Sequence, residues 1–235
     1  MWIKIWQKII ERWTFLLVPY GQIAYGQNAE DIVLAKFLDE RLKNKQKPGF
    51  YIDIGAHHPF RYSNTYYFYK KGWRGLNIDA DDKAIKLFEL FRPRDINVQA
   101  LVATQNKALT YFVFSDRAFN TCNSLLAKEL IKNKRAKLIK KIKIKPQNLK
   151  NLLKKYLKKE QKVDFLSIDV EGMDESVLQA YDFANFAPDF ILIEDLSFVT
   201  DVSQQKSKKI ARFLKKQGYH FVSQVFNTAF WQKKN

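Results

Sequence analysis

Short apolar runs alternate with longer amphipathic stretches along most of the chain. The runs have the length and composition of buried strands, whereas the stretches between them repeat their apolar positions at helical spacing. After a helix that begins at Asn28 or Ala29, these patterns predict strands at 50–54, 76–79 and 96–102 and helices at 63–71 and 83–91. Strands that alternate with helices in this way form a parallel sheet with right-handed crossovers.

The second half of the chain continues the alternation and adds two less regular strands. Residues 109–114 alternate well enough to form a strand, which we expect to be an addition to the core sheet. Residues 140–145 alternate lysine with isoleucine, as exposed edge strands do. The other elements are helices at 125–137, 146–157, 174–181 and 203–217, strands at 163–168 and 190–193, and a hairpin at 219–225 and 229–231 that turns at Asn227. The sequence therefore predicts an α/β fold with about seven strands in a mostly parallel sheet and helices on both faces.

The first 18 residues form a separate amphipathic pattern. Tryptophan beside basic residues suits a helix that lies in a membrane interface, but a helix packed on the domain or on a partner subunit has the same pattern. We therefore divide the chain into an N-terminal amphipathic helix and loop at 1–24 and one domain at 25–235. The two faces of the helix are defined by Trp2, Trp6 and Trp13 on one side and by Lys4, Lys8 and Arg12 on the other.

The composition of the chain indicates in which cellular compartment we expect the protein. The chain has 235 residues, of which 46% are apolar, enough for one sizeable core. Cys122 is the only cysteine, so no internal disulfide can form, and a reducing compartment is expected. No run of about 18 apolar residues is present to span a bilayer. We expect a cytoplasmic protein, with peripheral contact at the inner membrane face if residues 1–18 bind lipid.

The net charge of +17 is concentrated in one segment. Residues 128–162 contain fifteen lysines or arginines and only two acids, Glu129 and Glu160. Such a segment attracts phosphate-bearing substrates, anionic lipid or RNA, or forms a solvated face without a partner. Because it contains few aromatic residues for base stacking, nucleic acid is the least favoured partner.

Two of the predicted strands end in a carboxylate and indicate a nucleoside site. The run FYIDIGAHHP, residues 50–59, places Asp53 near the end of a strand, and Gly55 and Ala56 then allow a tight turn close to a ligand. The run GLNIDA ends the next strand in Asp79, 26 residues after Asp53. This spacing suits a loop that holds a cofactor and an acid that accepts from ribose hydroxyls, although an ordinary βαβ unit would also contain such a glycine.

Two further strand ends add acids to the same edge of the sheet. The run VDFLSIDVEG ends in Asp169 with Glu171 two positions later, and DFILIEDL ends in Glu194 and Asp195. Burying several carboxylates together costs free energy unless a cation or a hydrogen-bond donor compensates their charge. Their convergence therefore predicts a cationic or hydroxyl-bearing partner.

The chain from about residue 25 to 196 resembles the FkbM family of S-adenosylmethionine-dependent methyltransferases. The resemblance implies a Rossmann-like class I methyltransferase fold and methyl transfer to oxygen, commonly a sugar hydroxyl of a glycan, glycolipid or secondary metabolite. It rests on YGQNAEDIVL (25–34), FYIDIGAHHPFRYSNTYYFYKKGWRGLNIDA (50–80), RPRDIN (92–97), FNT (119–121) and IDVEGMDESVL (168–178).

The same resemblance implies how S-adenosylmethionine is bound. Asp53, Gly55 and Ala56 would line its methionine and ribose region, and Asp79 would hold its ribose hydroxyls. Gln27 and Glu30 belong to a leading segment that would fold over the cofactor. The loop departs from the wider methyltransferase pattern, because His57 and Ala56 follow a single glycine where many relatives have two or three.

The acceptor side requires a base, because a sugar hydroxyl holds its proton tightly. The candidates are His57, His58, Asp169 and Glu171, although His58 would equally suit a loop residue bound to backbone. A DVEG sequence follows the fourth core strand in place of the Asn/Asp-Pro-Pro-aromatic motif that accompanies many amine acceptors, so oxygen is favoured. Asp169, Glu194 and Asp195 form a candidate set of ligands for Mg²⁺.

Three alternatives stay open. A basic RNA-directed methyltransferase would explain the charge, and a non-catalytic basic binding protein with a degenerate cofactor cleft would explain it without chemistry. A dinucleotide oxidoreductase is less favoured, because no three-glycine fingerprint is present. Under the favoured hypothesis, an O-methyltransferase, the expected acceptor is a sugar-containing small molecule or a lipid-linked glycan.

Overall fold

The computed structural model describes residues 21–43, 47–195 and 208–234. The helix predicted at 1–18 lies outside these residues, and the proposed boundary at residue 24 stays a prediction. The strands are β1 Phe50–Ile54, β2 Arg74–Asp79, β3 Ile96–Gln99, β4 Leu109–Phe114, β5 Leu138–Ile144, β6 Phe165–Ile168, β7 Phe190–Glu194, β8 Tyr219–Val225 and β9 Thr228–Lys233.

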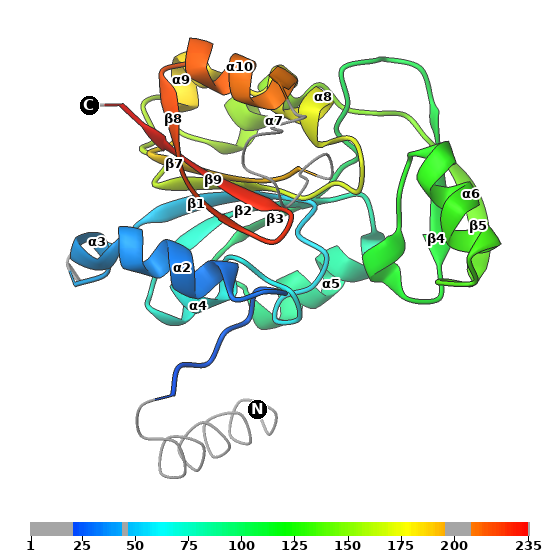
Figure 1. The fold of residues 1–235 in the computed structure, drawn as a ribbon, viewed down its shortest axis with the longest axis horizontal. Helices are drawn as coiled ribbons and strands as arrows, with labels where there is room; N and C mark the ends of the chain where they lie inside the picture. The colour runs from blue at the N-terminus through cyan, green and yellow to red at the C-terminus, as the bar shows by residue number, and fades with distance from the viewer. Residues whose placement is uncertain (1–20, 44–46, 196–207, 235) are drawn as a thin grey trace.

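A seven-stranded sheet in the order β3-β2-β1-β6-β7-β9-β8 forms the centre of the protein (Figure 1). The pairs from β3 through β7 are parallel, whereas β9 pairs antiparallel with both of its neighbours. The closing hairpin turns at Phe226 and Asn227, as predicted. A largely parallel sheet of seven strands with a terminal hairpin confirms the predicted fold class.

Helices cover both faces of this sheet (Figure 1). One layer contains α2, α4 and α5, and the opposite layer contains α7, α8, α9 and α10. None of the helices in the described ranges is long and apolar enough to cross a bilayer. The helices are α2 Glu30–Phe37, α3 Asp39–Lys43, α4 Tyr66–Lys70, α5 Asp82–Phe91, the 3-10 helix η1 Arg117–Phe119, α6 Ser124–Lys132, α7 Leu149–Tyr156, α8 Asp174–Ala180, α9 Phe183–Phe186 and α10 Lys208–Lys216.

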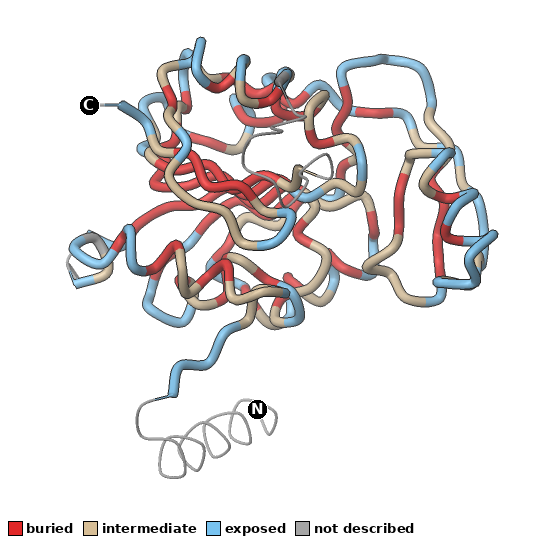
Figure 2. The backbone as a smooth tube through the Cα atoms, in the orientation of Figure 1, coloured by how far each residue is buried: buried red, intermediate tan, exposed pale blue. Residues whose placement is uncertain are grey.

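The strand β1 is buried on both faces, which explains its continuous apolar run (Figure 2). Ile52 and Ile54 pack in the core beneath α7, α8 and α10, because side chains alternate along a strand. Tyr51 packs on the other face, in the core beneath α2 and α4. Asp53 lies on the same face as Tyr51. It interrupts the apolar pattern only near the carboxyl end of the strand.

The expectation for residues 109–114 was wrong. They form β4, but β4 pairs antiparallel with β5 in a separate two-stranded sheet outside the core sheet. Phe112 and Phe114 of β4 pack against Ala127 and Leu130 of α6 in a small core of their own. Hydrophobic alternation predicts that a segment is a strand but does not specify its partner strand. The pairing of this segment could therefore not be predicted from the pattern.

Several predicted boundaries shift for identifiable reasons. The third strand ends at Gln99 rather than at Val102, which forms only an isolated bridge with Gln147. Helix α7 begins at Leu149 rather than at Pro146, because the side chain of Asn148 caps it by accepting from the Asn151 N–H. The described part of the predicted helix at 203–217 is α10, and its first residues lie outside the described ranges.

Candidate active site

A pocket opens where the carboxyl ends of β1, β2 and β6 meet. Its walls come from the loop after β1, the ends of β2 and β3, the segment after β6, and residues 111–122 of the small sheet and η1. This is the crevice in which open α/β sheets bind ligands. Of the residues predicted for the site, it brings together Gln27, Asp53, Gly55, Ala56, Asp79, Asp169 and Glu171.

The loop after β1 turns tightly against two neighbouring strands. The N–H groups of Gly55 and Ala56 donate to the Ile78 carbonyl at 2.9 and 3.2 Å. Gly55 has φ +84°, and a β-carbon there would overlap the backbone carbonyl of Asp169. Glycine is therefore required twice over at this position, for its conformation and for its lack of a side chain.

The Asp79 carboxylate fixes the loops on either side of it. One oxygen accepts from the His57 N–H at 2.8 Å and the other from the Asp81 N–H at 2.7 Å. Burial raises the pKa of Asp79 to about 6, against the lowering effect of these hydrogen bonds. Asp79 still lines the pocket, and carboxylate oxygens have further lone pairs to offer a ligand hydroxyl.

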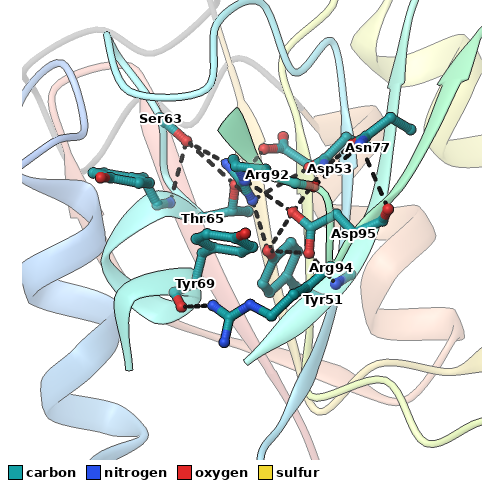
Figure 3. Close-up of polar contacts among 12 residues, drawn as sticks. Tyr51, Asp53, Ser63, Thr65, Tyr69, Asn77, Arg92, Arg94 and Asp95 are labelled. Carbon is teal, nitrogen blue, oxygen red and sulfur yellow. Dashed lines mark hydrogen bonds and ion pairs between the residues drawn. The ribbon is translucent and has the colours of Figure 1, made fainter. Parts of the chain in front are cut away.

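The Asp53 carboxylate ends a chain of hydrogen bonds that begins at a buried arginine (Figure 3). Arg92 Nη2 donates to the Thr65 hydroxyl at 3.0 Å, and that hydroxyl donates to Asp53 at 2.8 Å. Burial raises the pKa of Asp53 to about 6, while Thr65 and Arg92 act in the opposite direction. The chain of donors thus favours the ionised form of a carboxylate that burial disfavours.

Arg92 itself is fully buried within the RPRDIN segment (Figure 3). Its Nε pairs with Asp95 at 2.8 Å, and its Nη2 donates to the Tyr51 hydroxyl at 2.6 Å. Asp95 also accepts from the Tyr51 hydroxyl, from the Gly75 N–H and from the Asn77 side chain. This network ties β1, β2 and the segment before β3 together directly behind the pocket.

Carboxylates cluster at the ends of β6 and β7. Asp169, Asp174 and Glu194 each offer an oxygen within 4.8 Å of the others. Asp174 holds the DVEG turn by accepting from the N–H groups of Val170 and Gly172 at 3.0 and 3.1 Å. One Glu194 oxygen is buried without a hydrogen-bond partner, which is uncommon for such an atom.

This crowding shifts the protonation of the whole cluster. Although Asp169 is open to the pocket, the protein packed around it and the carboxylates of Glu194 and Glu171 raise its pKa. Burial and the charge of Asp174 raise the pKa of Glu194 and of Glu171. The raised pKa values make these carboxylates stronger proton acceptors than a free carboxylate, so a hydroxyl bound here would have a base beside it.

The predicted ligand set differs from the observed cluster by one residue. Asp195 is not a member of the cluster, and its N–H donates to the Asn227 carbonyl at 2.7 Å. Asp174 takes its place, because the turn after β6 folds back and brings the first residue of α8 beside Asp169. Asp174 lies six residues after the end of β6, so its place in the cluster could not be inferred from strand ends alone.

The structure distinguishes the two histidines that were candidate bases. His58 is not among the pocket residues, and its Nδ1 accepts from the Phe60 and Arg61 N–H groups, both at 3.1 Å. It is a loop residue bound to backbone, the alternative that its position left open. His57 lines the pocket instead, with its buried Nε2 lacking a partner. Burial lowers the pKa of His57 to about 4, so the ring is neutral near pH 7.

Glu30 supports the leading segment without lining the pocket. Its carboxylate accepts from the Asn28 N–H at 2.8 Å and from the Asn28 side chain at 3.1 Å. Gln27 of the same segment does reach the pocket.

Several pocket residues were not predicted from strand ends because they come from the small sheet and its loops. Tyr111 of β4 lines the pocket, as does Asn120, whose side chain accepts from the Phe114 N–H at 2.9 Å. Thr121 lines it as well, and its hydroxyl donates to the Glu171 carbonyl at 2.8 Å. The FNT segment was the available signal, since Asn120 and Thr121 belong to it.

Comparison with known proteins agrees with this geometry. No curated protein and no solved structure gives a significant match to the chain. The methyltransferase FkbM domain matches residues 53–221, from the first pocket carboxylate into β8. The match covers well over half of the chain, and the pocket lies at the edge of the sheet where such a domain binds its cofactor. The chain therefore belongs to the FkbM family and is an S-adenosylmethionine-dependent methyltransferase.

Proposed function

We propose that the protein transfers a methyl group from S-adenosylmethionine to a hydroxyl of a sugar, within a glycan or a glycolipid precursor. The observation that carries this proposal is the carboxylate cluster, which reaches the pocket through Asp169, a residue whose backbone carbonyl lies against Gly55 of the loop after β1. A methyl donor held by that loop lies next to groups that can accept a hydroxyl proton. The amide and hydroxyl side chains of Gln27, Asn64 and Thr121 line the same pocket and suit a polyhydroxylated acceptor.

On the cofactor side, we assign Asp53, Gly55 and Ala56 to the methionine and ribose region and Asp79 to the ribose hydroxyls. The support is that all four line the pocket, with Asp79 open to it between two anchored loops. S-adenosylmethionine carries its own leaving group on a positive sulfonium, so the protein's task is to align the donor with the acceptor oxygen.

The assignment of Asp79 predicts a loss of cofactor affinity. We expect Asp79→Ala to weaken S-adenosylmethionine binding by about 1 to 3 kcal/mol, because charged hydrogen bonds to the ribose are removed. Isothermal titration calorimetry measures this directly. Asp82→Ala is the matched control, since Asp82 lies three residues away, is exposed and forms an ion pair with Lys86 at 3.5 Å. Equal affinity of a folded Asp79→Ala variant and the parent would remove Asp79 from the cofactor site.

On the acceptor side, we assign proton removal to Asp169, with Glu171 beside it. Asp169 lines the pocket, and burial and neighbouring carboxylates raise its pKa, which makes it a stronger proton acceptor than a free carboxylate. His57 also lines the pocket and has an Nε2 without a hydrogen-bond partner, but burial lowers its pKa to about 4, so it is the weaker base of the two. His58 is less suited, since its Nδ1 is already bound to backbone.

A magnesium ion is a further part of the proposal. Asp169, Asp174 and Glu194 supply hard oxygen ligands, and the unpartnered Glu194 oxygen together with the mutual repulsion of the three groups fits a cation among them. When bound, such an ion would supply positive charge that lowers the pKa of a nearby hydroxyl. The protein's own contribution is to hold the three carboxylates together, which Asp174 achieves through the backbone of the DVEG turn.

Chelation tests the ion. We expect exhaustive treatment with EDTA to abolish most of the methyl transfer and added Mg²⁺ to restore it, while binding of S-adenosylmethionine measured by calorimetry stays unchanged. Full turnover after chelation would exclude an essential ion at the cluster and leave Asp169 as an unassisted base.

The reaction itself is tested with S-adenosylmethionine labelled in its methyl group. We expect label in a fraction of nucleotide sugars, oligosaccharides or lipid-linked saccharides, and we expect it to survive mild alkali, because a methyl ether does so and a methyl ester does not. Transfer of the label to total RNA instead would replace the sugar by the RNA-directed alternative. Tight cofactor binding without transfer to any of these acceptors would favour a binding protein.

A further inference from the structure

The outer lobe, which we define as residues 124–145, projects from the side of the protein and contains α6 and β5 (Figure 1). It carries nine cationic side chains and one acid, Glu129. Every one of the nine is exposed. They are Lys128, Lys132, Lys134, Arg135, Lys137, Lys140, Lys141, Lys143 and Lys145.

The charge of the outer lobe is not neutralised from within the protein. Across the described residues, none of the nine cations is within ion-pair distance of a carboxylate. Lys143 donates to the Thr110 hydroxyl at 2.7 Å, and Lys141 lies over the Phe112 ring at 5.4 Å, and neither of these partners carries a negative charge. An array of this kind produces a local positive potential that favours an anionic partner.

Exposed aliphatic side chains lie among these lysines. Leu125 is 74% exposed, Ile139 is 58% exposed and Ile131 is 43% exposed. The outer lobe contains no aromatic residue on which nucleic-acid bases could stack. It contains only one arginine, the residue type whose guanidinium binds a phosphate through two parallel hydrogen bonds. Lysines around aliphatic side chains fit the boundary of an anionic bilayer, where the charges meet headgroups and the aliphatic groups enter the acyl region.

The outer lobe is joined directly to the acceptor end of the pocket. Asn123 caps α6 by accepting from the Leu125 N–H at 3.0 Å, and its side chain lies against Gly172 of the DVEG turn. Thr121 donates to the Glu171 carbonyl in the same turn. A membrane that binds the outer lobe would therefore be connected, through these contacts, to the turn that we assign to the acceptor side of the pocket.

We propose that the outer lobe docks on a bilayer rich in anionic lipid and holds the acceptor end of the pocket at the lipid surface. The docking itself rests on the charge and exposure of the outer lobe. The consequence for the acceptor rests on the proposed function, because a glycan linked to a lipid would be presented at that surface. The outer lobe shares no residue with the segment 1–18, for which the sequence predicts a lipid contact of its own.

Sedimentation with vesicles tests the docking on the full chain. We expect binding to vesicles that contain phosphatidylglycerol and little binding to vesicles of phosphatidylcholine alone. The variant Lys132→Glu, Lys137→Glu, Lys140→Glu should bind roughly a hundredfold more weakly, since each basic side chain near an anionic surface contributes measurably to the attraction. The matched control is Lys150→Glu, Lys154→Glu, Lys158→Glu, which reverses three exposed lysines on or just after α7 and should bind nearly as the parent does.

The remaining outcomes identify what else could explain binding. Equal weakening in both triple variants would assign it to net charge and overturn the proposal. So would loss of binding on deletion of residues 1–18 with no effect of the lobe variant. Tighter binding to an RNA oligonucleotide than to the vesicles at the same ionic strength would assign the outer lobe to nucleic acid. Calorimetry with S-adenosylmethionine should give the same affinity for all variants, so failure of the docking can be told apart from failure of the proposed reaction.

Discussion

Arg92→Met should lower the free energy of unfolding by about 3 to 5 kcal/mol. This is the largest effect on stability that we expect from a single substitution of a polar residue in this protein. Removal of the guanidinium leaves the Asp95 carboxylate buried without its cation and deprives the Tyr51 and Thr65 hydroxyls of a donor. A buried charge that has lost its partner costs several kcal/mol, because water cannot replace the partner. Urea unfolding monitored by circular dichroism measures the change.

The neighbouring arginine supplies the control. Arg94 lies two residues away in the same segment, is exposed and donates to the Tyr69 carbonyl at 2.5 Å, so Arg94→Met should cost less than about 1 kcal/mol. The double variant Arg92→Met, Asp95→Asn should be more stable than Arg92→Met alone, because the stranded charge is gone. If Arg92→Met unfolds at the same urea concentration as the parent, the network in Figure 3 does not stabilise the fold.

Asp169→Asn should reduce methyl transfer by roughly 10² to 10⁴-fold, the range typical of the loss of a positioned base. The amide keeps the size of the side chain but cannot accept the hydroxyl proton. Affinity for S-adenosylmethionine should change far less than turnover if Asp169 acts on the acceptor side, as we propose. Single-turnover transfer of the labelled methyl group, together with calorimetric titration of the cofactor, separates the two effects.

Glu89→Gln provides the comparison for that measurement. Glu89 lies on the exposed side of α5 and is not among the pocket residues, so the same chemical change there should leave turnover intact. A variant at Asp169 that retains turnover but loses cofactor affinity would move Asp169 from the acceptor side to the cofactor side. One that retains both would exclude it from the reaction.

The strands of the core sheet and the cofactor loop were predictable because burial on both faces leaves a clear pattern. β1 and β6 appear in the sequence as apolar runs that end at acids, and Gly55 follows the first of them. The pairing of β4 was not predictable, since alternation describes the faces of a strand and not its neighbour. Its true partner, β5, is separated from it by α6, and the two strands meet because Phe112 and Phe114 bury against that helix.

The site was predictable to the extent that it is built from strand ends. Asp53, Asp79 and Asp169 reach the pocket because strand ends meet at one edge of the sheet. Asp174 reaches the carboxylate cluster through the fold of a turn, and the choice between His57 and His58 depends on which ring finds backbone donors. Such details follow from the path of a loop, and hydrophobic periodicity carries no information about it.

The contact between Gly55 and the Asp169 carbonyl makes the two halves of the pocket inseparable. Any side chain introduced at position 55 would displace the backbone that carries Asp169, so donor affinity and transfer would be lost together. The wall formed by Asn120, Thr121 and Cys122 is different, because it belongs to the segment that leads into the outer lobe. Substitutions in that wall should therefore change the shape of the pocket without moving the turn at Gly55.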